Sequence, residues 1–368
     1  MRFLPVLAAI VWLAACTDRS SFVVVPDAVD VGTPRTVFAA SARAREADGS
    51  YGYRRANRLQ FLELTVSIPP THTPGSLNFS YGRPDPETQF VLAEQEVFTS
   101  AELLGRRLLD DQREHGSPVR EVTLFVHGYN ATQNETAFRA AQLANDIEIP
   151  GSLMIYSWPS RARAFGYAYD LDSMLFARDG LEQTIRQLKA SGAERIVLVA
   201  HSMGAALSME MMRQAEIREP GWSDRMLEGV VLISPDLDVD VFRTQMDRIG
   251  TVPQPFVVMV SRKDPALNIS ARLRGTAESR RLGNIDSIDR IADYPVDVID
   301  TTAFSGDAAS RHFVAATSPA LVTLLSSAPA MGEAFGPEET SFDFLIPDGV
   351  EVSGRAKEII LARPGEDR

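Results

Sequence analysis

The most constraining feature of this sequence is a short apolar strand that runs through a tight turn into a helix between residues 196 and 217. Ile196–Ala200 is a continuous apolar run, as in strands buried inside a parallel sheet. The turn at 200–204 reads Ala-His-Ser-Met-Gly, and Met203–Ile217 has a helical pattern. Small residues on both sides of the serine let the strand and the helix approach closely, which lifts the serine above the sheet. The segment therefore predicts that Ser202 is a nucleophile.

Short apolar runs alternate with longer helical stretches over most of the chain. Strands are expected at 61–68, 90–98, 122–126, 153–156, 196–200, 230–233, 256–260 and 296–299, and helices at 101–113, 134–146, 170–189 and 203–217. Such alternation is typical of parallel strands whose connections are helices packed on the sheet. We therefore expect an α/β protein with a mostly parallel central sheet and helices on both faces.

A serine hydroxyl is a weak nucleophile unless a base removes its proton, and histidine is the usual base. When the serine lies in a strand-to-helix turn of this kind, the chain order is serine, then acid, then histidine. The histidines of the chain are His72, His115, His127, His201 and His312. Beyond the serine turn itself only His312 lies downstream, so elimination predicts His312 as the base.

Three aspartates are candidates for the acid that orients this histidine. Asp264 follows the expected strand 256–260, Asp236 follows the strand 230–233, and Asp307 is close to His312 in the sequence. Ligand sites of parallel sheets lie at the carboxyl ends of the strands, which favours Asp264 and keeps Asp236 as the alternative. Each aspartate could instead simply cap a helix or form a turn.

The oxyanion of an acyl-transfer reaction needs preset backbone N–H groups. One is expected from Met203, the residue after the nucleophile, and the other from the loop His127-Gly128-Tyr129-Asn130 that follows an earlier strand. Tyr129 is slightly favoured over Asn130 for this second N–H. His127 itself is expected to be structural.

The N-terminus resembles the leader of bacterial lipoproteins. Arg2 precedes an apolar run from Pro5 to Ala15 that is too short to span a bilayer as a helix. The run ends in Leu-Ala-Ala-Cys, and Cys16 is the one cysteine of the chain. In that class of proteins the leader is removed before the cysteine, which then carries acyl chains. We therefore expect lipid attachment at Cys16 and a membrane-anchored protein that faces the periplasm or the exterior of the cell.

Composition suggests how the rest of the chain is divided. Residues 1–15 are expected to be the signal peptide, 16–58 a tether and edge segment, and 59–326 the folded domain. Residues 327–368 are expected to form a C-terminal extension with a strand-like run at 359–362.

The formal net charge of −12 argues against nucleic acid as a partner, because phosphate backbones bind to basic surfaces. The five scattered histidines and the single cysteine give no spacing of a metal site, and no glycine-rich phosphate loop follows a strand. We therefore expect no metal, no cofactor and no nucleic acid.

Several motifs together resemble a branch of bacterial α/β-hydrolases, many of them without an assigned function. They lie between Leu62 and Leu325, at Val66–Pro70, Phe125–Asn130, Tyr156–Ser160, Ala200–Gly204, Ser234–Asp236, Ser261–Asp264 and Arg311–His312. The resemblance implies the α/β-hydrolase fold and a Ser-Asp-His site at Ser202, Asp264 and His312.

The predicted function is that of a serine hydrolase tethered to the cell envelope, which cleaves a small acyl ester as a carboxylic ester hydrolase through an acyl-enzyme. Two alternatives stay open. The same fold could serve as a non-catalytic binding protein of the envelope, or the same triad could work as an acyltransferase or a peptidase, because the fold does not fix the acceptor.

Overall fold

The computed structural model describes residues 19–20, 22–114, 116, 119–147, 149, 151–275, 281–306, 308–326 and 347–361. The expected signal peptide 1–15 and lipid-attachment residue Cys16 lie outside these residues, as do Asp307 and most of the segment after 326. Within them, no helix is both long enough and apolar enough to cross a membrane.

The described residues form one eleven-stranded sheet. Its strands are β1 Thr33–Arg45, β2 Tyr51–Ile68, β3 Val91–Phe98, β4 Glu121–Val126, β5 Ser152–Ser157, β6 Arg195–His201, β7 Gly229–Ile233, β8 Phe256–Val260, β9 Asp297–Asp300, β10 Pro347–Ser353 and β11 Ala356–Leu361, in the order β10-β11-β9-β8-β7-β6-β4-β5-β1-β2-β3. The pairs from β11 through to β1 are parallel, while β10 at one end and β2 and β3 at the other are antiparallel. The expected fold class, a mostly parallel sheet, is confirmed.

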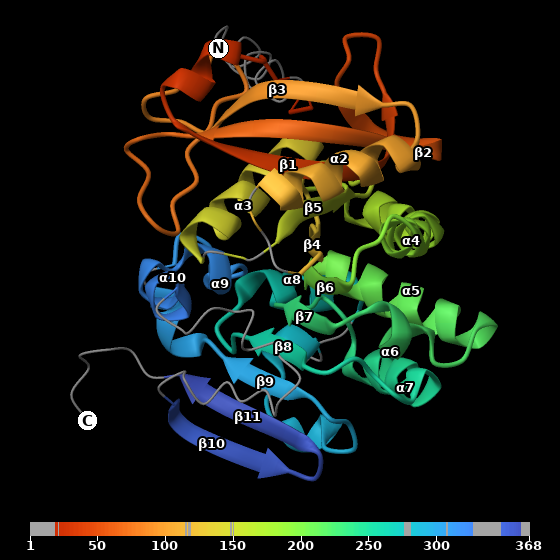
Figure 1. Ribbon diagram of the computed structural model, residues 1–368. Coiled ribbons are helices and arrows are strands. Elements are labelled where there is room, and N and C mark those ends of the chain that lie inside the picture. The colour runs from red at the N-terminus through yellow and green to blue at the C-terminus, as the bar shows by residue number, and fades with distance from the viewer. Residues whose placement is uncertain are drawn as a thin grey trace, which may run out of the picture.

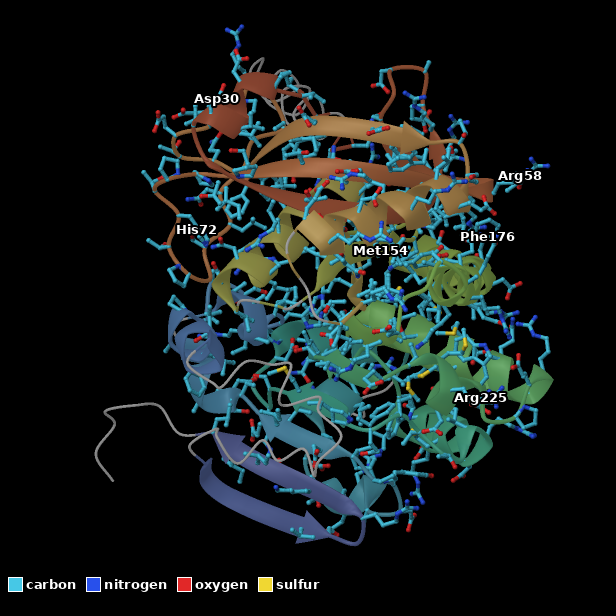
Figure 2. The ribbon with its side chains drawn as sticks, in the orientation of Figure 1. Asp30, Arg58, His72, Met154, Phe176 and Arg225 are labelled. Carbon is cyan, nitrogen blue, oxygen red and sulfur yellow. The ribbon has the colours of Figure 1, made fainter. Side chains whose placement is uncertain are left out.

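Helices cover both faces of this sheet (Figure 1). One face carries α2 Ala101–Glu114, α4 Tyr167–Ala190, α5 Met203–Arg218, α6 Trp222–Met226 and α7 Val239–Ile249, and the other carries α3 Gln133–Asp146, α9 Val314–Thr317 and α10 Pro319–Ser326. The alternation of side chains along a strand divides the core accordingly. On β4, Leu124 and Val126 pack in the first layer, whereas Phe125 packs in the second. Figure 2 shows Met154 of β5 inside the first layer and Phe176 of α4 at the surface.

The segment 16–58 was expected to be a tether and edge segment ahead of the domain, and for residues 33–58 the structure differs. β1 lies within the sheet, antiparallel to β2 and parallel to β5. Its sequence is rich in alanine and arginine, so it has little hydrophobic signal, and yet Arg43 is only 1% exposed. The Arg43 guanidinium donates to Ser157 Oγ at 2.8 Å and to backbone carbonyls of Gly52 and Ala131 at 3.0 and 2.8 Å. These hydrogen bonds, made across the fold, allow a charged residue to sit in an interior strand.

The first described residues are docked on the body as well. Arg19 forms an ion pair with Glu135 at 2.8 Å, and Phe22 packs edge-on against Tyr81 and Phe138 with ring centroids 5.4 Å away in each case. Val25 then donates its backbone N–H to Leu92 O at 2.9 Å. This stretch is therefore a packed strap rather than a free tether.

The expected C-terminal extension also contributes to the sheet. β10 and β11 form a hairpin, and β11 pairs in parallel with β9. Ile359 and Leu361 are buried in the layer that contains α3 and α10. The strand-like run at 359–362 thus corresponds to the end of β11, and the structured domain extends beyond residue 326.

Candidate active site

Ser202 lies at the junction of β6 and α5, in the middle of the sheet. Its φ and ψ are 55° and −120°, a backbone conformation that residues other than glycine rarely adopt. Its backbone N–H donates to Ile233 O at 3.0 Å, and its carbonyl accepts from Ala205 and Asp236 N–H at 3.0 and 3.1 Å. These bonds hold the strained turn in place, and such strain is concentrated at functional sites. The turn also puts Ser202 at the positive end of α5.

Two glycines let the neighbouring segments approach the turn. A Cβ atom on Gly204 would lie 2.3 Å from His127 O and 2.6 Å from Val126 O, so α5 packs directly on the end of β4. A Cβ atom on Gly128 would lie 2.8 Å from the Cβ of Ser202. The small residues around the serine are therefore required by backbone contacts.

The three residues predicted as nucleophile, base and acid lie in one hydrogen-bonded chain. Ser202 Oγ is 2.7 Å from His312 Nε2, and His312 Nδ1 is 2.7 Å from Asp264 Oδ2. Geometry of this kind lets the imidazole accept the serine proton at Nε2 while Nδ1–H donates to the carboxylate. Ser202 and Asp264 are buried, whereas the His312 side chain is 22% exposed.

Asp264 has two functions at once, one for each carboxylate oxygen. It precedes α8 Pro265–Leu273, and its Oδ1 accepts the backbone N–H groups of Ala266 and Leu267 at 2.9 and 3.3 Å. Its Oδ2 is the oxygen that faces His312. Helix capping and contact with the histidine are therefore compatible here, although the sequence presents them as alternatives. The cap also fixes the orientation of the carboxylate.

Asp236, the alternative acid, is engaged by other partners. Its Oδ2 accepts from Tyr167 Oη at 2.8 Å, and its Oδ1 accepts from Ser270 Oγ at 2.5 Å and faces Arg281 Nε at 3.3 Å. Among the described residues it makes no hydrogen bond to His312. Its backbone N–H supports the carbonyl of Ser202, so the structure places it behind the turn.

The residues expected to bind an oxyanion come from two segments next to Ser202. Met203 is the first residue of α5, where backbone N–H groups have no acceptor within the helix. Tyr129 follows Gly128, which is in contact with Ser202, and its hydroxyl donates to Ala164 O at 2.5 Å. The backbone N–H of the next residue, Asn130, is directed at Asp170 and helps to stabilise its charge. Of the two candidates in this loop, Tyr129 is therefore the one whose N–H has no acceptor among the described residues.

His201, the residue before Ser202, supports the loop that carries His312. Its Nε2–H donates to His312 O at 3.1 Å, and its ring stacks on Phe313 with centroids 3.9 Å apart. Burial, together with the neighbouring His312, lowers the pKa of His201 well below its ordinary value, so the ring is neutral. Sequence reasoning assigned no role to His201, because its place beside the serine does not reveal which backbone its ring contacts.

His127 is buried as a structural residue under the oxyanion loop. Its Nδ1 is 2.8 Å from Gly128 O, and its ring stacks on Trp158 with centroids 4.9 Å apart. Burial, and secondarily the charge of Arg43, lowers the pKa of His127 to about 3. The Trp158 indole returns a hydrogen bond to His127 O at 2.7 Å. His127 therefore positions the loop and does not face the nucleophile.

A cavity of about 230 Å³ opens beside the oxyanion loop. Its wall combines the aromatic residues Phe79, Phe125, Tyr129 and Phe313 with the charged residues Arg19, Glu135 and Arg139, and it does not include Ser202 or His312. The described residues contain no cluster of histidine, cysteine and carboxylate side chains that could hold a metal ion.

Comparison with known proteins gives one family. The model of a family described as alpha/beta hydrolase of unknown function (DUF900) matches residues 109–328, which is more than half of the chain. No curated protein matches.

Among solved structures, a fungal esterase from Rhizomucor miehei is 13% identical with a TM-score of 0.32, over 88% of this chain and 88% of that one. An esterase of Pyrobaculum calidifontis is 12% identical with a TM-score of 0.30, over 66% of this chain and 73% of that one. A Trichoderma reesei cutinase is 13% identical with a TM-score of 0.23, over 37% of this chain and 64% of that one. Likeness at this level carries no argument about substrate.

Proposed function

The chain belongs to this family of alpha/beta hydrolases, and from that premise we propose that it is a serine hydrolase that cleaves small carboxylic esters through an acyl-enzyme. The observation that carries the proposal is the chain of 2.7 Å contacts from Ser202 Oγ through His312 to Asp264. A strained turn, a helix N-terminus and a capped carboxylate support the same reading.

In the proposed reaction His312 Nε2 takes the proton of Ser202 as Oγ attacks the acyl carbon. Asp264 holds the imidazole in the tautomer with hydrogen on Nδ1 and stabilises the imidazolium that forms. The backbone N–H groups of Met203 and Tyr129 stabilise the oxyanion. His312 then gives its proton to the leaving alcohol, and a water activated by the same histidine releases the acid.

The size of the cavity beside the oxyanion loop favours a short acyl group. Its volume of about 230 Å³ is below the range of about 300 to 1,000 Å³ usual for drug-sized ligands. Its aromatic residues suit an apolar group, while Arg19, Glu135 and Arg139 make the rest of its wall polar. We therefore expect short-chain esters to react faster than long-chain ones.

The proposed place of action is the cell envelope. The leader 1–15 is followed directly by Cys16, the one cysteine of the chain, in the pattern of a lipoprotein. We propose that acyl chains at Cys16 anchor the mature protein to a membrane, with the hydrolase domain outside the cytoplasm.

A panel of p-nitrophenyl esters from acetyl to long acyl chains tests the proposed activity. Hydrolysis of the short esters that is lost in Ser202→Ala is the expected result. No hydrolysis of any ester by the wild type would contradict it and would favour a non-catalytic binding protein. Adding alcohol or amine acceptors to the same assay separates hydrolysis from acyl transfer, since a transferase yields new esters or amides in place of the free acid.

A further inference from the structure

We propose that the mouth of the active site is a docking face for an anionic lipid surface, so that the anchored enzyme works with this mouth against the membrane. The inference rests on the proposed lipid anchor at Cys16, and the docking itself rests on described residues around the mouth. These are the exposed apolar residues Phe165, Ile269 and Leu273 and the exposed cations Arg163, Lys263 and Arg272, together called the rim.

The first observation is where the chain after the anchor is held. Arg19 donates to Asn130 Oδ1 at 2.7 Å and to Ala162 O at 2.9 Å, in addition to its ion pair with Glu135. Asn130 adjoins the oxyanion residue Tyr129, and Ala162 belongs to the loop that carries Phe165. Cys16 is three residues before Arg19, and three extended residues span at most about 11 Å. A lipid on Cys16 is thereby confined near the mouth.

The second observation is an unpartnered apolar surface next to the mouth. Phe165 is 102% exposed, and Ile269 and Leu273, one turn apart on α8, are 57% and 63% exposed. A fully exposed phenylalanine contributes nothing to packing within the fold. Exposed apolar side chains of this kind insert between lipid headgroups.

Each part of the rim is tied to a residue of the proposed site. α8 begins at Asp264, and the Phe165 loop accepts the Tyr129 hydroxyl through the carbonyls of Arg163 and Ala164 at 2.9 and 2.5 Å. The loop and the helix are joined by Tyr167, whose hydroxyl lies 2.8 Å from Ser270 Oγ. The apolar residues therefore lie on the loop and the helix that carry the contacts of Tyr129 and Asp264.

The charge of the rim is opposite to that of the whole chain. Between 160 and 166 and between 262 and 275 the basic residues are Arg161, Arg163, Arg262, Lys263, Arg272 and Arg274, and the one acidic residue is the buried Asp264. In the described part of the chain Arg163, Lys263 and Arg272 have no carboxylate within ion-pair distance. Cations beside exposed apolar groups, on a chain of net charge −12, match an anionic lipid surface.

Photocrosslinking tests the orientation without depending on activity. Benzoylphenylalanine is introduced in the full-length chain at Ile269, or at Ile217 as the matched control, and membranes with radiolabelled phospholipid are irradiated. Ile217 is 52% exposed on the far end of α5, about 20 Å along that helix from Ser202. We expect about tenfold more lipid on position 269 than on position 217, because only the rim reaches the headgroups.

Equal crosslinking at the two positions, or crosslinking of position 269 to protein instead of lipid, would overturn the proposal. Charge is tested in vesicles by Arg272→Gln, which should weaken binding about fivefold when phosphatidylglycerol is present and have no effect on neutral lipid. Acylation of Cys16 is measured on the same samples by mass spectrometry. An unmodified Cys16 together with lipid crosslinked at position 269 would refute the lipid anchor but support the docking face. Ester hydrolysis is measured separately, so that failure of the proposed activity is distinguished from failure of the docking.

Discussion

Two clusters of one serine, one histidine and one aspartate lie in the described part of the molecule. In the first, Ser202, His312 and Asp264 are joined by two contacts of 2.7 Å. In the second, His72 Nε2 lies 2.6 Å from Asp146 Oδ1, and Ser76 Oγ is 3.3 Å from His72 Nδ1. The residue types are the same, so the backbone around each serine must account for the difference between the clusters.

The hydroxyl of Ser76 already has an acceptor. It donates to Thr73 O at 2.6 Å within its own turn, so its proton is not directed at His72. Asp146 also accepts the N–H of Gly75 at 2.8 Å, which ties this loop to the end of α3. Ser202, in contrast, has His312 as the one partner of its hydroxyl among the described residues, and it stands at a strained turn before a helix. The comparison teaches that the acceptor of the serine hydroxyl distinguishes the two clusters. A serine whose hydroxyl faces the histidine can act as a nucleophile, whereas a serine whose hydroxyl donates to a backbone carbonyl only stabilises its loop.

Removing the two histidines should have the largest contrasting effects. His312→Ala should lower kcat/KM for a short ester by about 10⁵-fold or more, because no other base among the described residues contacts the Ser202 hydroxyl. His72→Ala should lose the contact with Asp146 and reduce stability with little change in turnover. Steady-state kinetics on both variants checks this, and comparable losses of activity would show that the two clusters are not distinct.

Exchanging the acids should give a somewhat smaller effect. Asp264→Asn should lower kcat by about 10⁴-fold, because the imidazole would lose its preferred tautomer. Asp146→Asn should leave kcat nearly unchanged, and Asp236→Asn should act mainly through stability. If Asp236→Asn abolished activity while Asp264→Asn kept it, the assignment of the acid would be wrong.

The sequence was sufficient for the parts of the site that follow from strand order. Ser202 and Asp264 each follow an apolar strand, and parallel strands bring those ends to one edge of the sheet. The choice between Asp264 and Asp236 needed coordinates, because both follow neighbouring strands and only their side-chain partners differ. β1 was not predicted because its sequence carries little hydrophobic signal and contains Arg43. This arginine can be buried only because its guanidinium donates to Ser157 Oγ and to the carbonyls of Gly52 and Ala131, which the sequence pattern does not reveal.

Backbone crowding offers a third contrast between the two regions. Gly204→Ala should destabilise the protein by about 2–3 kcal/mol, because the new Cβ atom would meet carbonyl oxygens at 2.3 and 2.6 Å. Gly82→Ala is the matched control in the loop that follows Ser76, where the nearest atom would be 3.8 Å away. Urea unfolding of both variants measures the difference, and equal midpoints would show that the turn relaxes without cost.

A pH dependence of the stability should come from two buried, neutral histidines near the nucleophile. The folded-state pKa of His127 is lowered to about 3 by burial, and that of His201 is lowered well below its ordinary value. Below about pH 6.5 the unfolded chain binds protons that the folded chain does not, so stability falls as the pH falls.

His127 should contribute a loss of about 1.4 kcal/mol per pH unit between pH 6 and pH 4. His201 should lower the stability in the same direction. Unfolding in urea across this range measures the slope. His127→Asn should reduce the slope of the unfolding free energy against pH by about 1.4 kcal/mol per pH unit, the contribution of one proton. An unchanged slope would mean that His127 is protonated in the folded protein.

The most direct test of the account is to map the serine that reacts with a fluorophosphonate probe. Wild type is treated with the probe, digested and analysed by mass spectrometry, beside Ser202→Ala and Ser76→Ala. The account predicts one adduct on Ser202, its loss in Ser202→Ala and its retention in Ser76→Ala. An adduct on Ser76, or no adduct on folded wild-type protein, would contradict it.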